Sequence, residues 1–61
     1  MSSHDILTTW MKSHVDDYRK ECEDDDDVVE YLVMDAPSET GIYNISESEV
    51  RELAQQCVKS S

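Results

Sequence analysis

The sequence predicts a small α+β domain in which one helix, a β-hairpin and a second helix follow one another along the chain. Three observations predict this fold: a helical repeat of apolar residues over 3–23, a β-branched and aromatic run over 28–34, and a second helical repeat after Ser46. The 61 residues are enough for one small core, so a single domain over residues 1–61 is expected.

The first helix is predicted from apolar side chains that recur at steps of mostly one, three and four residues. These residues are Ile6, Leu7, Trp10, Met11, His14, Val15, Tyr18 and Cys22. Ser2 and Asp5 have the spacing of a capping pair at the helix start. Trp10 is expected either in the core or, partly exposed, as an anchor for a partner.

The hairpin is predicted from three consecutive segments. Residues 28–34 are rich in Val, which favours strands. Residues 35–41 hold the only proline and the only glycine of the chain and are predicted to form the turn. Residues 42–46 complete the hairpin as a short second strand.

The last helix is predicted from a capping box and an apolar repeat. Ser46 and Glu49 supply the box, because a serine oxygen can accept from the backbone N–H three residues later. The apolar face that follows is Val50, Leu53, Ala54, Cys57 and Val58.

The two predicted helices cannot cover both faces of the predicted two-stranded sheet. Both faces of the predicted first strand are largely apolar, whereas two helices can cover only one of them, and both strand edges stay open. Pairing with a second copy through the sheet or the helices would cover the rest, so a homodimer is expected. The predicted residues for dimer or apolar contact are Val28, Leu32 and Met34, which share one strand face.

The charge of the chain is strongly negative and unevenly placed. The formal net charge is −10, and residues 21–40 hold nine acidic and no basic residues. Such a balance argues against direct binding to nucleic acid or to an anionic membrane, since both would repel it. It favours the basic surface of a nucleic-acid-binding protein or complex as the partner.

The acidic block at 21–27 is predicted to be a working surface. It follows the first helix, where negative charge would oppose the helix dipole, so helix stability does not explain it. In an extended chain alternate side chains lie about 6.6 Å apart on one side, a spacing on the scale of backbone phosphates in nucleic acid. The predicted partner-binding residues are Glu23, Asp24, Asp25, Asp26, Asp27, Glu30, Asp35 and Glu39.

Other kinds of site do not fit the spacing of the residues. A calcium loop counted from Asp24 has Val29 where the invariant glycine belongs and no glutamate at its twelfth position. Histidine and cysteine occur without a zinc-finger spacing, and no phosphate loop or nucleophile elbow is present. No metal site, cofactor or catalytic residue is therefore predicted, and so small a chain is not expected to be an enzyme.

The location expected for the protein is the cytoplasm. Its two cysteines are too few for a disulfide-stapled secreted domain, and buried thiols are expected instead. The amino-terminal residues lack the basic and apolar regions of a signal peptide, and no apolar run is long enough to span a membrane.

In size and charge the chain resembles the small acidic inhibitors that phages and mobile elements encode. Those proteins block host nucleic-acid enzymes or defence complexes, including restriction, CRISPR and uracil-DNA glycosylase systems. Residues 24–37 also look a little like a stretch of the phage uracil-DNA glycosylase inhibitor, but the glutamate-bearing first strand of that inhibitor has no counterpart here. We assign no family from this stretch.

Two functional hypotheses follow from the sequence. In the first, the protein is a non-enzymatic inhibitor whose acidic residues mimic nucleic-acid phosphates and occupy a basic site. In the second, it is a small adaptor or regulator that binds a protein through its helix faces or the hairpin edge, and the acidic run only keeps it in solution.

Overall fold

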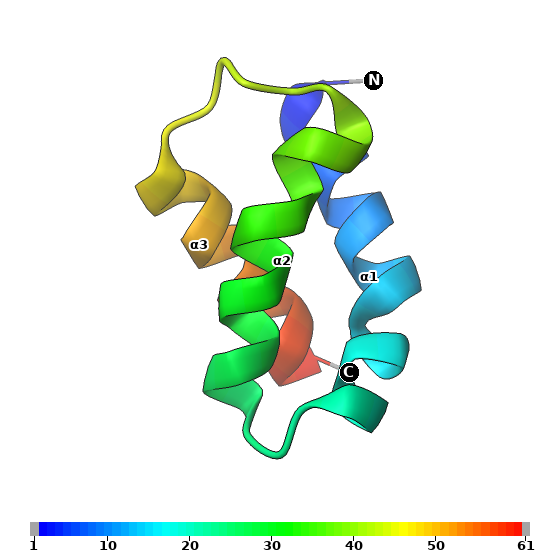
Figure 1. The fold of residues 1–61 in the computed structure, drawn as a ribbon. Coiled ribbons are helices and arrows are strands. Elements are labelled where there is room, and N and C mark those ends of the chain that lie inside the picture. Colours follow the sequence, from blue (N-terminus) through cyan, green and yellow to red (C-terminus); the bar gives the residue numbers. More distant parts are fainter. Residues whose placement is uncertain (1, 61) are drawn as a thin grey trace.

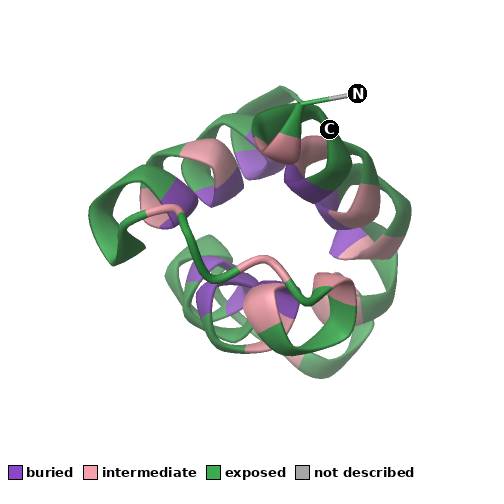
Figure 2. Cartoon of the chain, turned by 90° about the horizontal axis from the view of Figure 1, so that it is seen from above, coloured by how far each residue is buried: buried purple, intermediate pink, exposed green. Residues whose placement is uncertain are grey.

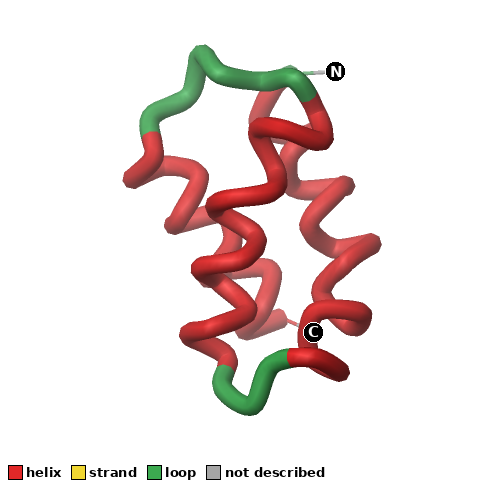
Figure 3. Tube along the Cα trace, in the orientation of Figure 1, coloured by secondary structure: helices red, strands yellow, loops and turns green. Residues whose placement is uncertain are grey.

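The chain folds as three α-helices, shown by the computed structural model in Figure 1. The structure describes residues 2–60, and within that range no β-strand occurs (Figure 3). The helices are α1 (Ser3–Glu21), α2 (Asp25–Thr40) and α3 (Glu47–Ser60). A short turn joins α1 to α2, and the loop at residues 41–46 crosses one end of the bundle to join α2 to α3 (Figure 1).

The predicted α+β fold is wrong, and α2 is the element that overturns it. Its buried residues, which recur at a helical spacing, are Val28, Val29, Leu32, Val33 and Ala36. In a strand these side chains would divide between two faces, whereas a helix places all of them on one side. Helical valine costs up to about 0.7 kcal/mol, but burying a Val or Leu side chain contributes about 1.5–3 kcal/mol. Burial therefore outweighs the strand preference.

The predicted turn at residues 35–41 and the second strand at 42–46 are also absent. Pro37 lies inside the last part of α2, where it has no N–H to donate to the helix ladder. The helix ends at Gly41, whose φ of 74° is left-handed and whose N–H donates to the Pro37 carbonyl at 2.8 Å. Glycine thus ends the helix here, and the residues after it form the loop.

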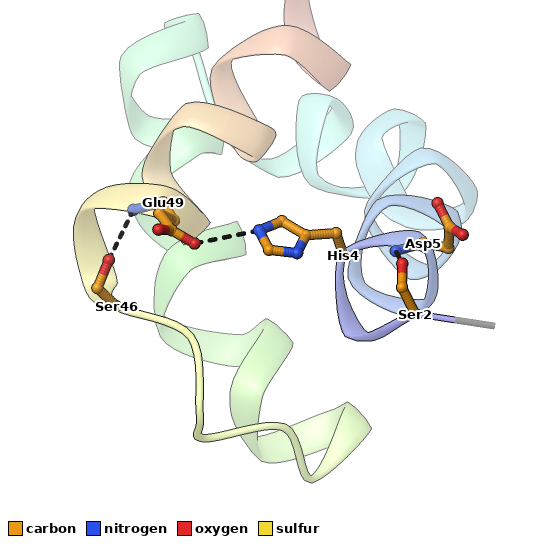
Figure 4. Close-up of polar contacts among 5 residues, drawn as sticks. All are labelled: Ser2, His4, Asp5, Ser46 and Glu49. Atoms are coloured by element: carbon orange, nitrogen blue, oxygen red, sulfur yellow. Dashed lines mark hydrogen bonds and ion pairs between the residues drawn. The ribbon is translucent and has the colours of Figure 1, made fainter.

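Both predicted helices are confirmed, together with their caps. The hydroxyl oxygen of Ser2 accepts from the N–H of Asp5 at 3.2 Å, and that of Ser46 accepts from the N–H of Glu49 at 3.3 Å (Figure 4). His4 lies 3.1 Å from the Glu49 carboxylate, so α1 and α3 are also joined where both helices begin (Figure 4). The first helix ends two residues earlier than predicted, because Cys22 has an extended backbone.

The core lies between the three helices, whose buried positions face one another when the bundle is viewed end-on (Figure 2). Its largest fully buried side chains are Leu7, Met11, Val15, Val28 and Leu32. The homodimer was predicted from an open sheet face and open strand edges, and the helices of residues 2–60 offer neither. That reason for a dimer no longer holds.

Candidate functional site

Four of the six carboxylates in the acidic block lie at the beginning of α2, whereas Glu21 is the last residue of α1. Asp24 is the N-cap residue, and Asp25, Asp26 and Asp27 form the first turn. The expectation that these charges oppose a helix dipole is therefore wrong, because carboxylates at a helix N-terminus are favourable by about 0.3–1 kcal/mol each. The block has a structural role in α2, and all four aspartates remain exposed.

The fold brings basic residues to this end of the bundle. Arg19 and Lys20 lie in the last turn of α1, and Lys59 lies in the last turn of α3. Arg19 contacts Asp25, with Nε 3.7 Å from Oδ1, and also donates to the carbonyl of Val58 at 2.7 Å. Six carboxylates and three basic side chains thus gather here for a net charge of −3. Arg19 and Lys20 already precede the block along the chain, and folding adds Lys59 from α3.

The remaining acidic residues of α2 point in different directions. Glu30 faces α3, where both of its carboxylate oxygens accept from the Arg51 guanidinium, and this hydrogen bond lowers the Glu30 pKa. Asp35 faces α1 and accepts from the Tyr18 hydroxyl at 2.6 Å. Glu39 is exposed near the far end of α2. The predicted single row of anions is wrong, because successive residues of a helix are turned by about 100°.

The predicted apolar contact residues are divided between the core and the surface. Val28 and Leu32 are 1% and 0% exposed, so they are core residues and are not available to a partner. Met34 is 69% exposed. A strand would have placed the three on one face, whereas the helix turns Met34 away from the other two.

The outward side of α2 combines an acidic residue with exposed apolar side chains. It consists of Asp27, Tyr31, Met34 and Ser38, which are all exposed and spaced by four, three and four residues. We name these residues the α2 face. Tyr31 is 50% exposed, and the large side chains of Tyr31 and Met34 are neighbours on the helix surface. The predictions from sequence missed Tyr31, although its spacing from Asp27 and Met34 is the signal that would have identified it.

A groove borders the α2 face on the side of α3. It has a volume of about 330 Å³ and lies between the second half of α2, the loop and the start of α3. Its lining includes Met34, Pro37, Ile42, Tyr43, Ile45 and Glu47. Tyr43 is 73% exposed and was predicted to be part of a strand rather than of a site. We name this feature the α2–α3 groove.

Aromatic rings border the α2 face on the side of α1. The rings of Trp10 and His14 are stacked with centroids 4.4 Å apart, and those of Tyr18 and Tyr31 are stacked at 6.1 Å. The ring centroids of Trp10 and Tyr18 are 6.4 Å apart. Trp10 is partly buried, so it is neither a fully buried core residue nor a fully exposed one. The Tyr18–Tyr31 stacking and the Tyr18–Asp35 hydrogen bond join α1 to α2, whereas the Trp10 contacts lie within α1.

The Tyr18–Asp35 contact makes the free energy of unfolding depend on pH in the alkaline range. Burial and the adjacent Asp35 carboxylate raise the Tyr18 pKa above its ordinary value of 10.0. A raised pKa means that the folded state keeps the phenol proton after the unfolded state has lost it, so this stabilisation falls as the pH rises above 10.0. We expect Tyr18→Phe to show a smaller loss of unfolding free energy than the parent between about pH 9 and pH 11, measured by urea unfolding. Equal losses in both proteins would contradict the coupling.

The described residues contain no cluster of three or more His, Cys, Asp or Glu side chains that could hold a metal ion. Cys57 is buried, Cys22 is half-buried, and both are free thiols. Burial raises the pKa of the Cys57 thiol. Among the helices of residues 2–60, none has the length and apolar character that crossing a bilayer requires.

Comparison of the chain with protein-family models, curated proteins and solved structures finds no match. The case for a function therefore depends on the geometry of the α2 face, the α2–α3 groove and the charges around them.

Proposed function

We propose that this protein is a non-enzymatic inhibitor that occupies a basic, nucleic-acid-binding surface on another protein. The observation that carries the proposal is the position of exposed carboxylates around the exposed apolar residues of the α2 face. Glu23, Asp27 and Glu39 are exposed and form no ion pair within residues 2–60. Tyr31 and Met34 lie between Asp27 and Glu39 along α2.

Charge and apolar surface would act at different stages of such an encounter. A net charge of −10 attracts a basic surface over distance and speeds association, while salt weakens this effect. Exposed Tyr and Met side chains then contribute contact area once the surfaces meet. The partner's groove for nucleic acid is the basic surface that such a molecule would block, as small phage and mobile-element inhibitors block theirs. With both cysteines free, we place this activity in the cytoplasm.

A second candidate function is that of an adaptor in which the acidic residues do not touch the partner. The acidic block favours it, because Asp25, Asp26 and Asp27 already stabilise the first turn of α2 and lie close to basic side chains. In that case the α2 face would bind a partner through its apolar residues, and the remaining charge would only keep the protein in solution.

Capture from the native host distinguishes the two candidates. The protein is immobilised, exposed to nuclease-treated host lysate and eluted with double-stranded DNA. A triple variant, Glu23→Gln, Asp27→Asn and Glu39→Gln, removes three exposed carboxylates around α2. A matched control, Asp16→Asn, Asp17→Asn and Glu52→Gln, makes the same change in net charge on other exposed positions.

For the inhibitor, we expect DNA to release the captured protein, and salt between about 50 and 300 mM to weaken its binding steeply. The triple variant should capture at most about one tenth of the host protein that the control variant captures. If DNA releases nothing and the triple variant captures as much as the control, the inhibitor proposal fails and the adaptor is favoured. Circular dichroism of each variant shows whether its helices are intact.

A further inference from the structure

The α2–α3 groove is an apolar surface that the acidic residues do not explain. Its rim carries Met34 and Tyr43, which are 69% and 73% exposed and are the two most exposed large apolar side chains among the described residues. Pro37, Ile42 and Ile45 contribute further apolar lining. Scattered exposed apolar residues are ordinary, whereas exposed residues gathered around one groove are typical of a contact site.

We propose that the α2–α3 groove receives a basic amphipathic helix of the partner, with an apolar side chain between Met34 and Tyr43 and a lysine or arginine beside Glu47. This inference depends on the proposed function, because it assumes a basic partner protein, and it names the part of that partner which docks. The groove gives the apolar contact, and Glu47 together with the net charge of −10 selects a basic partner.

The wall of the groove is fixed before any partner arrives. Gly41 ends α2 with a left-handed backbone, and the Ile42 N–H donates to the Thr40 hydroxyl at 3.4 Å. Ile42 and Ile45 are packed against the core, so the loop that joins α2 to α3 in Figure 1 is held at both ends. A preformed wall lowers the entropy lost on binding, which favours a docking site over a passive hollow.

Charge decides between the occupants that an apolar groove could accept. Glu47 is the acidic residue that lines the groove, and none of the described basic residues lines it. A second copy of this chain would bring a further net charge of −10 and would be repelled. An acidic or neutral apolar segment would gain nothing from Glu47, whereas a basic helix would gain both the apolar and the charged contact.

The test uses synthetic peptides and so does not depend on the native partner. A 14-residue amphipathic helix of leucine and lysine is the probe, with the corresponding leucine–glutamate peptide and oligolysine as comparisons. Binding is measured by calorimetry, and the site is mapped by amide chemical shifts. The groove variant is Met34→Ser with Tyr43→Ser. The control is Ile6→Ser, which removes an apolar side chain that is 39% exposed on α1.

We expect the leucine–lysine peptide to bind the groove variant at least about tenfold more weakly than the parent, and the Ile6→Ser control like the parent. Glu47→Gln should weaken the same peptide by a few-fold, and oligolysine should bind the parent and the groove variant alike. Unchanged affinity in the groove variant, or equally tight binding of the leucine–glutamate peptide, would overturn the inference.

Two further results would also overturn it. One is a dimer in sedimentation that the groove variant abolishes, because the occupant would then be a second copy. The other is capture of the host protein by the groove variant at the level of the parent, which removes the groove from the interface while leaving the inhibitor proposal intact. Failure of the inhibitor proposal itself is seen separately, in the DNA elution and in the acidic triple variant.

Discussion

Leu32→Ala is expected to unfold much of the protein at room temperature. Leu32 is 0% exposed in the centre of α2 and belongs to the core shared by all three helices. Truncating a buried leucine to alanine costs about 2–5 kcal/mol. A single core in a chain of this size rarely supplies more than about 3–5 kcal/mol in total. Urea unfolding followed by far-ultraviolet circular dichroism should therefore show a midpoint near or below zero urea.

The matched control is Met34→Ala, two residues along the same helix. Met34 is 69% exposed, so its truncation should change the unfolding free energy by about 0.5 kcal/mol or less. The pair also tests the fold, because a strand would place both side chains on one face and make their effects similar. Equal destabilisation by the two substitutions would contradict a helical α2.

Replacing Asp25, Asp26 and Asp27 together by asparagine is expected to destabilise the protein by about 1–3 kcal/mol. The three carboxylates lie in the first turn of α2, close to its unpaired backbone N–H groups, and Asp25 also contacts Arg19. The opposite sign would be expected if the block ended α1, because removing negative charge there would relieve an unfavourable dipole. Urea unfolding at low ionic strength gives the sign and the size.

Removing three negative charges also lessens the repulsion within a chain of net charge −10, which stabilises the folded state. The control Asp16→Asn, Asp17→Asn and Glu52→Gln changes the net charge equally but leaves the first turn of α2 intact. The difference between the two triple variants therefore isolates the position of the charges. If both change stability alike, the block has no special role at the N-terminus of α2.

The two roles of the acidic block affect how binding results are interpreted. A substitution at Asp25 or Asp26 weakens α2 and removes surface charge together, so lost binding would not identify a contact. Glu23 lies outside the helix, and Glu39 lies near its other end. Glu23 and Glu39 report on binding with less effect on folding. Asp27, the third residue of the triple variant that tests the inhibitor proposal, lies in the first turn of α2, so circular dichroism of the variant is needed beside the binding result.

The local sequence predicts α1 and α3 well because each contains its own start signal and one unambiguous apolar stripe. Ser2 and Ser46 cap these helices as predicted, and Val50, Ala54, Cys57 and Val58 are buried together. In α2 the local signals conflict. Its valines favour a strand, and Pro37 and Gly41 are typical of a turn. The helical spacing of residues 28, 29, 32, 33 and 36 is present within residues 25–40, but these strand and turn signals compete with it.

Of the candidate site, the sequence predicted the exposure of the acidic residues, which holds for all but the half-buried Asp35, but not their arrangement. Glu30 and Asp35 were predicted to extend one acidic surface, yet Arg51 binds the first and Tyr18 donates to the second from different helices. Tyr31 and Tyr43 were not predicted as site residues at all. Their exposure depends on α2 being a helix and on the path of the loop after Gly41.

The sequence by itself determined the excess of negative charge, the two capped helices and the amount of apolar residue available for one small core. These properties depend on residues that are close together along the chain. Only the tertiary structure decided that α2 is a helix, which places Leu32 in the core and Met34 at a groove. Burial against two other helices outweighs the strand preference of three valines, and that energy exists only when all three helices are packed.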